Sequence, residues 1–142
     1  MRRTLIVGLV AAAALIGATS SAAKEFGPGD LRLCDTTHCV PIVDRAAVQL
    51  LSRFYYTGPQ PTRTARPRWG ARAFELRFSN GYATGVVGGA ALDRFLSFGV
   101  HAQRFRSRAW YRMSPATARE LRLLATDLVP LRVTRALVSR SR

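Results

Sequence analysis

Both cysteines of the chain and one of its two histidines lie within a single stretch, LCDTTHCVPI. Two thiolates and an imidazole are ligands that zinc accepts, whereas two thiols alone can form a disulfide. The order Cys34, His38, Cys39 lacks the two separated pairs of ligands that are common in zinc sites. The other histidine, His101, could supply a fourth ligand, but nothing in the sequence brings it close. We therefore expect neither a metal site nor a cofactor.

The same stretch predicts a disulfide. Residues 35–38 favour a turn, because Asp and Thr side chains bond nearby backbone groups, and the flanking residues suit extended strands. A tight loop between antiparallel strands would set Cys34 opposite Cys39, with their Cα atoms about 4.5–5.5 Å apart. A disulfide requires about 4.4–6.8 Å, so the bond fits this geometry. We predict that Cys34 and Cys39 are bonded and staple a hairpin.

Arginine and aromatic residues form a second group with evident chemistry. Arginine binds phosphate and carboxylate through paired donors, and it stacks on aromatic rings. The alternation of a strand would place five candidate anion-binding residues on one face: Arg104, Arg106, Arg108, Trp110 and Arg112. Further arginines lie near Trp69 in the sequence: Arg63, Arg66, Arg68 and Arg72. The alternative is that Trp110 belongs to the core and that the guanidinium groups are only solvated.

Residues for catalysis are sparse. His101 is the one candidate base outside the cysteine turn, and no Gly-x-Ser-x-Gly elbow accompanies it. The chain has only eight acidic residues, and several of them suit turns or helix caps. We identify no catalytic residue, and a small extracytoplasmic enzyme that uses His101 is kept as an alternative.

The N-terminus has the pattern of a secretory signal peptide. Arg2 and Arg3 precede the apolar run 5–18, and small residues follow as far as Ala23. The run is shorter than the roughly 20 residues that cross a bilayer. We therefore predict a signal peptide over 1–23, with a retained anchor as the alternative. No later stretch of the sequence is long and apolar enough to cross a membrane.

The charge balance points to anionic partners. Lys and Arg number 22 against 8 acidic residues, a formal net charge of +14. Such a surplus favours contact with an acidic envelope polymer, an anionic membrane surface or another protein, and the alternative is a solvated basic surface. Export argues against nucleic acid as a natural target. As a whole the chain resembles the broad class of small exported bacterial proteins.

Residues 24–142 predict a single mature α+β domain. Antiparallel hairpins, with about five to seven short strands, would pack against two helices. The first helix spans about 44–56 and is capped by Asp44. The second spans about 115–128 and is capped by Ser114, with proline at its first position.

The stretch AFELRFSNGYATGVV predicts a central hairpin. Asn80-Gly81 favours a two-residue turn. That turn would pair, on one apolar face, Phe74 with Val87, Leu76 with Gly85 and Phe78 with Ala83. The opposite face would be polar and carry Glu75, Arg77 and Tyr82, with Glu75 as a surface charge.

Residues 57–68 predict an exposed, partly extended loop. The segment TGPQPTRTARPR contains three prolines and three arginines and almost nothing apolar. An inhibitor-like or regulatory domain that presents this loop is a further alternative function.

Together these features predict an exported small basic protein, secreted or held in the cell envelope. Its most consistent role is a non-catalytic binding or interaction module for an anionic envelope component or a protein partner.

Mass spectrometry of protein recovered outside the cytoplasm should find a mature N-terminus near Lys24, because the small residues up to Ala23 suit signal cleavage. Non-reducing analysis of the same sample should find both thiols oxidised. Protein recovered only from inside the cell, with its leader intact and its thiols reduced, would contradict the prediction.

Overall fold

Strands β1 (Leu31–Cys34) and β2 (Cys39–Pro41) form the predicted hairpin around the two cysteines. The register places Cys34 opposite Cys39, with their Cα atoms 4.1 Å apart, and the two sulfur atoms are bonded. The predicted disulfide is therefore present. β2 lies at one edge of the sheet, so the disulfide links this edge strand to its neighbour β1.

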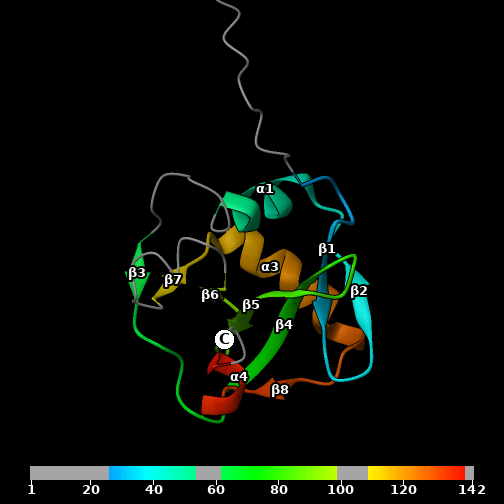
Figure 1. Cartoon of the computed structure of the whole chain (residues 1–142). Coiled ribbons are helices and arrows are strands. Elements are labelled where there is room, and N and C mark those ends of the chain that lie inside the picture. The colour runs from blue at the N-terminus through cyan, green and yellow to red at the C-terminus, as the bar shows by residue number, and fades with distance from the viewer. Residues whose placement is uncertain (1–25, 54–61, 99–108, 140–142) are drawn as a thin grey trace, which may run out of the picture.

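The computed structural model describes residues 26–53, 62–98 and 109–139, which form one antiparallel sheet with three α-helices (Figure 1). In this part of the chain the sheet has eight strands, in the order β2-β1-β4-β5-β6-β7-β3, and β8 pairs with β4 off this path. The remaining strands are β3 (Arg63–Thr64), β4 (Arg72–Phe78), β5 (Ala83–Gly88), β6 (Arg94–Ser97), β7 (Trp110–Arg112) and β8 (Leu131–Arg132). The predicted α+β class is confirmed, with one strand more than the upper number expected.

Two main helices begin at the predicted caps. Helix α1 (Arg45–Arg53) starts after Asp44, whose Oδ1 accepts a first-turn backbone N–H at 2.7 Å. Helix α3 (Pro115–Leu124) starts after Ser114, whose hydroxyl accepts a first-turn backbone N–H at 3.2 Å. A 3-10 turn, η1 (Ala125–Asp127), continues α3 close to its predicted end. The last predicted residues of the first helix, 54–56, lie outside the described residues.

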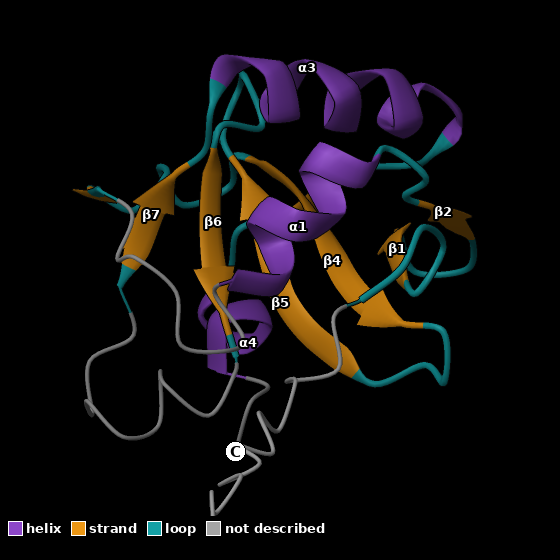
Figure 2. Cartoon of the chain, turned by 90° about the horizontal axis from the view of Figure 1, so that it is seen from above, coloured by secondary structure: helices purple, strands orange, loops and turns teal. Residues whose placement is uncertain are grey.

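The larger core lies between the sheet and these two helices. Figure 2 shows α1 and α3 on one side of the strands. Their buried side chains, such as Val48 and Leu121, pack with Phe74 and Phe95 from the sheet, all at most 1 % exposed. Burying a side chain of this size contributes about 1.5–3 kcal/mol, so this layer supplies most of the apolar stabilisation.

The opposite face of the sheet is also buried, which corrects the expectation of a one-sided sheet. The C-terminal segment adds β8 beside β4, and helix α4 (Arg135–Ser139), which the sequence did not predict, follows it. A second cluster forms on this face from Ala73, Val86, Leu96, Phe98, Trp110, Val133 and Leu137. The central strands therefore carry apolar residues on both faces.

Glu75 lies in this second layer and is only 1 % exposed, so its assignment as a surface charge is wrong. It pairs across the sheet with Val86 on one side and Cys34 on the other. Arg77 forms a salt bridge to it and donates from both Nε and Nη2. A buried carboxylate needs such a partner, because desolvation of an unpaired charge costs several kcal/mol.

The central hairpin keeps part of its predicted register. Phe74 pairs with Val87 and Leu76 with Gly85, but a register shift after Leu76 pairs Arg77 with Ala83. The predicted opposition of Phe78 and Ala83 is therefore wrong. The cause is a three-residue loop in place of a two-residue turn: the N–H of Phe78 donates to the carbonyl of Tyr82, and Gly81 takes a positive φ of 90°.

Close packing explains a glycine that could suggest a phosphate-binding loop. A Cβ at Gly85 would lie 2.5 Å from the carbonyl oxygen of Leu96 and 2.6 Å from the ring of Phe95. No larger residue fits there without moving β6. Gly85 is therefore a close-packing position and not part of a phosphate-binding loop.

The predictions for the N-terminus and for the Pro/Arg loop fall wholly or partly outside the described residues. The signal peptide over 1–23 lies outside them, as do residues 57–61 of the Pro/Arg loop. The rest of that loop is mostly exposed, although Pro67 is buried and Arg63–Thr64 pairs with β7. None of the helices in the described ranges is long and apolar enough to cross a membrane.

The carboxylate of Asp35 ties the cysteine hairpin to the C-terminal part of the chain. Its Oδ1 accepts the backbone N–H groups of His38 and Thr37, each at 2.7 Å, and its Oδ2 accepts that of Val129 at 2.9 Å. The hydrogen bond from His38, followed by those from Thr37 and Val129, holds the pKa of Asp35 well below its ordinary value. The turn role of Asp35 was predicted, and its long-range contact was not.

Reduction of the disulfide should lower the free energy of unfolding by about 2 kcal/mol, because the bond closes only a short loop. Denaturant unfolding with and without reductant measures this difference. The double variant Cys34→Ala/Cys39→Ala is the matched control and should not respond to reductant. A reduced protein as stable as the oxidised one would contradict the prediction.

Replacing Asp35 with Asn should lower the melting temperature at pH 7, and the deficit should shrink in acid. The folded pKa lies below the value of about 3.9 in the unfolded chain. The stabilisation is therefore complete above that value and declines as pH falls toward the folded pKa. Thermal unfolding at pH 7 and about pH 2.5 tests this. Asp127→Asn, which removes an exposed carboxylate, is the control, and an equal deficit at both pH values would refute the assignment.

Candidate functional site

The cysteine turn does not form a metal site. Cys34 and Cys39 are joined, and the exposed His38 has its Nδ1 2.8 Å from the hydroxyl oxygen of Thr37. Within the described ranges, no three His, Cys, Asp or Glu side chains gather in a way that could hold a metal ion. The cysteines therefore serve the fold.

The predicted anion-binding residues are only partly described. Arg104, Arg106 and Arg108 lie outside the described residues, as does His101. Arg112 is exposed on β7, whereas Trp110, at 6 % exposed, lies in the second core cluster. The side chain of Trp110 is therefore part of the core, which confirms the alternative prediction for this residue.

The second predicted set, around Trp69, forms an ordered surface. The guanidinium of Arg66 stacks over the ring of Trp69, with its central carbon 3.4 Å from the ring centroid, and its Nη1 donates to the carbonyl of Pro67 at 2.9 Å. Trp69 itself is 45 % exposed. Arg94 on β6 donates from Nη1 to the carbonyls of Ala65 and Arg66, at 3.1 and 3.2 Å. These contacts attach the loop before β4 to the end of the sheet.

A cavity of about 360 Å³ lies between this loop and the turn that joins β5 to β6. Its walls are Pro67, Arg68, Ala71, Gly89, Ala90, Ala91, Asp93 and Arg94. Two of these residues are cationic and one is anionic, and most of the others are small and apolar. The cavity therefore combines charged donors, one acceptor and an apolar surface.

Arg68 and Arg94 line the cavity, and further arginines on other elements contact the segments that form it. Arg122 on α3 donates to the carbonyl of Ala91 at 2.7 Å, and Arg132 on β8 donates to that of Gly70 at 3.3 Å. Arg112 is the cross-strand neighbour of Arg94. We define the arginine rim as Arg66, Arg68, Arg94, Arg112, Arg122 and Arg132.

Within the described residues, no salt bridge pairs an acidic side chain with an arginine of this rim. Four of its guanidinium groups donate to backbone carbonyls, which are neutral. Across the described residues the only salt bridge is the one between Arg77 and Glu75, in the second core layer. The rim therefore presents positive charge, on partly fixed side chains, to whatever enters the cavity.

Sequence reasoning found part of this rim and missed the rest. Arg66, Arg68 and Arg112 were named as candidates, but Arg94, Arg122 and Arg132 were not. These three lie on different elements, and only their hydrogen bonds to the loops at residues 65–70 and 89–93 bring them together. No local pattern of the sequence marks such a meeting point.

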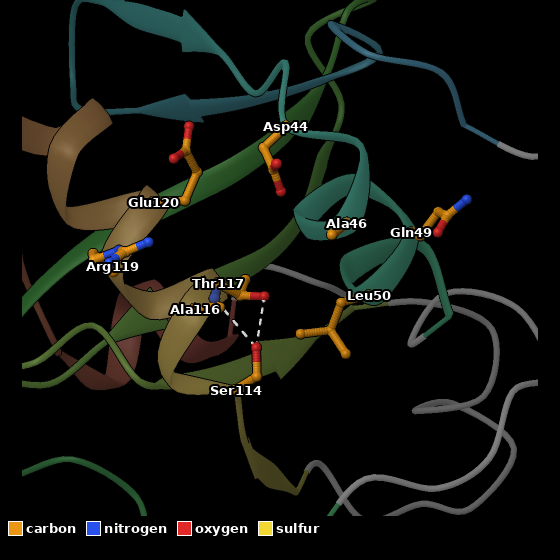
Figure 3. Close-up of a pocket in the computed structure, with 9 residues that line it drawn as sticks. All are labelled: Asp44, Ala46, Gln49, Leu50, Ser114, Ala116, Thr117, Arg119 and Glu120. Carbon is orange, nitrogen blue, oxygen red and sulfur yellow. Dashed lines mark hydrogen bonds between the residues drawn. The ribbon is translucent and has the colours of Figure 1, made fainter.

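A second cavity, of about 380 Å³, lies between the starts of α1 and α3 (Figure 3). The helices contribute similar residues: Asp44, Ala46, Gln49 and Leu50 from the first, and Ser114, Ala116, Thr117, Arg119 and Glu120 from the second. Figure 3 shows the hydroxyl of Ser114 bonded to the backbone and side chain of Thr117.

Two polar side chains of this groove, Asp44 and Ser114, are occupied by helix capping. Ser114 and Asp44 each hold a helix start, and the groove walls contain no histidine to activate the hydroxyl. Arg119, Asp44 and Glu120 give it mixed charge. We therefore regard the cavity inside the arginine rim as the candidate functional site.

The chain matches no protein-family model, no curated protein and no solved structure, so its function is inferred from geometry and chemistry alone.

Proposed function

We propose that this protein is an exported, non-catalytic binding module that holds an anionic ligand in the cavity inside the arginine rim. The observation that carries the proposal is the bonding of the rim. Four of its six guanidinium groups are fixed by backbone carbonyls, one of them also by an aromatic ring, and no described carboxylate pairs with the rim. Arginines held in this way keep their charge available for a ligand.

Arginine suits this task better than lysine. A guanidinium has five donors, and in Arg94 only Nη1 is engaged among the described residues. The other donors can therefore bind an oxyanion while the first keeps the side chain in place. Fixing the side chain before binding also reduces the entropy that binding would otherwise cost.

Export is the second part of the proposal. The N-terminal pattern of positive, apolar and small residues supports it, and the Cys34–Cys39 disulfide is compatible with an extracytoplasmic location. An acidic component of the cell envelope is therefore the proposed partner, because an exported protein meets it and it carries the negative charge that the arginine rim binds.

The two alternative functions have less support. The enzyme hypothesis depends on His101, which lies outside the described residues. The inhibitor hypothesis depends on the Pro/Arg loop, and the described end of that loop is bound to the sheet through β3 and Arg94. Neither has a specific observation in its favour.

The double variant Arg68→Gln/Arg94→Gln should weaken binding to an immobilised carboxylate polymer about tenfold or more. Each lost charge-assisted hydrogen bond costs about 1.5–3 kcal/mol, and about 1.4 kcal/mol corresponds to a factor of ten. Surface plasmon resonance on poly-glutamate, at several salt concentrations, measures the change.

The matched control is Arg32→Gln/Arg45→Gln, which removes the same charge from exposed positions outside the rim. It should change the affinity by less than about threefold, through general electrostatics alone. Equal losses in the two double variants would mean that net charge drives the binding, and the proposed site would be rejected.

A further inference from the structure

One residue of the cavity wall does not suit a simple anion. Asp93 lies among the arginines, and its Oδ1 would be 3.5 Å from a Cβ placed on Gly89 at the back of the turn. In the described part of the chain, no hydrogen bond or ion pair occupies its carboxylate. A ligand that carried only negative charge would be repelled here. Asp93 instead offers an acceptor to a ligand group that donates a hydrogen bond.

The surrounding charge limits what that donor can be. A carboxylate accepts hydrogen bonds from ammonium groups and from hydroxyls. Six rim arginines create a positive field that repels an ammonium, whereas a neutral hydroxyl carries no such penalty. A neutral donor such as a hydroxyl therefore suits Asp93 best, on the same ligand whose acid group would face Arg68 and Arg94.

The remaining walls suit a ring with an apolar face. Pro67, Ala71, Ala90 and Ala91 supply small apolar surfaces. The volume of about 360 Å³ is at the small end of ligand pockets, which suits one or two rings of this kind. A sugar ring presents C–H groups on one face and hydroxyls at its edge, so it can use the apolar wall and Asp93 together.

We propose, on the basis of the proposed function, that the anionic ligand is an acidic polysaccharide, whose sugar carries a carboxylate or phosphate for the arginines and a hydroxyl for Asp93. An anionic membrane fits less well. A bilayer surface is broad, whereas the cavity is concave, and the carboxylate inside it would repel a lipid phosphate.

The test compares three probes by isothermal titration calorimetry: oligogalacturonate, poly-glutamate of matched charge and phosphatidylglycerol vesicles. The wild-type protein should bind oligogalacturonate about tenfold more tightly than poly-glutamate, which has carboxylates but no hydroxyls. Asp93→Asn should lower the preference for oligogalacturonate over poly-glutamate, since it replaces a charged acceptor with a weaker neutral one, whereas the loss of a repulsive charge acts on both polymers alike.

The other outcomes distinguish failure of the sugar inference from failure of the proposed function. If Asp93→Asn strengthens binding to both polymers equally, Asp93 acts only as a repulsive charge. The sugar inference then fails, while the proposed anion site is retained. If the vesicles bind most tightly, the ligand is a membrane and the inference also fails. If Arg68→Gln/Arg94→Gln changes no binding at all, the proposed function itself fails.

A second variant guards against a folding defect in Asp93→Asn. Asp93→Glu keeps a charged acceptor at this position, and its fold should persist, as its circular dichroism would show. Its preference for oligogalacturonate over poly-glutamate should exceed that of Asp93→Asn, because a carboxylate accepts a hydrogen bond from a hydroxyl more strongly than an amide does. An equal preference in the two variants would overturn the inference.

Discussion

Burial of both faces of the β4–β5 hairpin is the constraint on which the other features depend. Helices α1 and α3 cover one face, and the C-terminal segment must cover the other. To do so, Val133 bonds through its backbone to Gly70 and Ala71, and its side chain packs near Pro67 and Trp110 around Gly88. This closure holds the loop before β4 against the end of the sheet. The cavity between that loop and the β5–β6 turn is thus a product of two-sided packing.

Whether a charged side chain of this protein is paired with an opposite charge depends on its exposure. Glu75 lies within a core layer, and it is paired with Arg77, because an isolated buried carboxylate would be costly. The arginine rim lies at the surface, where solvation makes pairing unnecessary. Its members bond to backbone carbonyls and so combine defined positions with retained charge. That combination distinguishes the rim from a general excess of arginine.

The small disulfide hairpin depends on more than its covalent bond. Asp35 binds the two N–H groups of its own turn and also that of Val129, close to the start of the segment that covers the second face. One carboxylate thus connects the first hairpin with the C-terminal part of the chain. The disulfide fixes the local shape of the turn, and Asp35 fixes its place in the fold.

The sequence by itself determined the local elements. Asp44 and Ser114 marked the helix starts, and the turn formers between Cys34 and Cys39 predicted the disulfide, because caps and tight turns depend on neighbours in the chain. Tertiary structure decided the rest. The burial of Glu75 and the meeting of the arginine rim arise from contacts between distant segments, and the shifted register of the central hairpin arises from a three-residue loop that the Asn-Gly pair did not predict. Such contacts are selected by how layers pack, and short-range patterns do not record them.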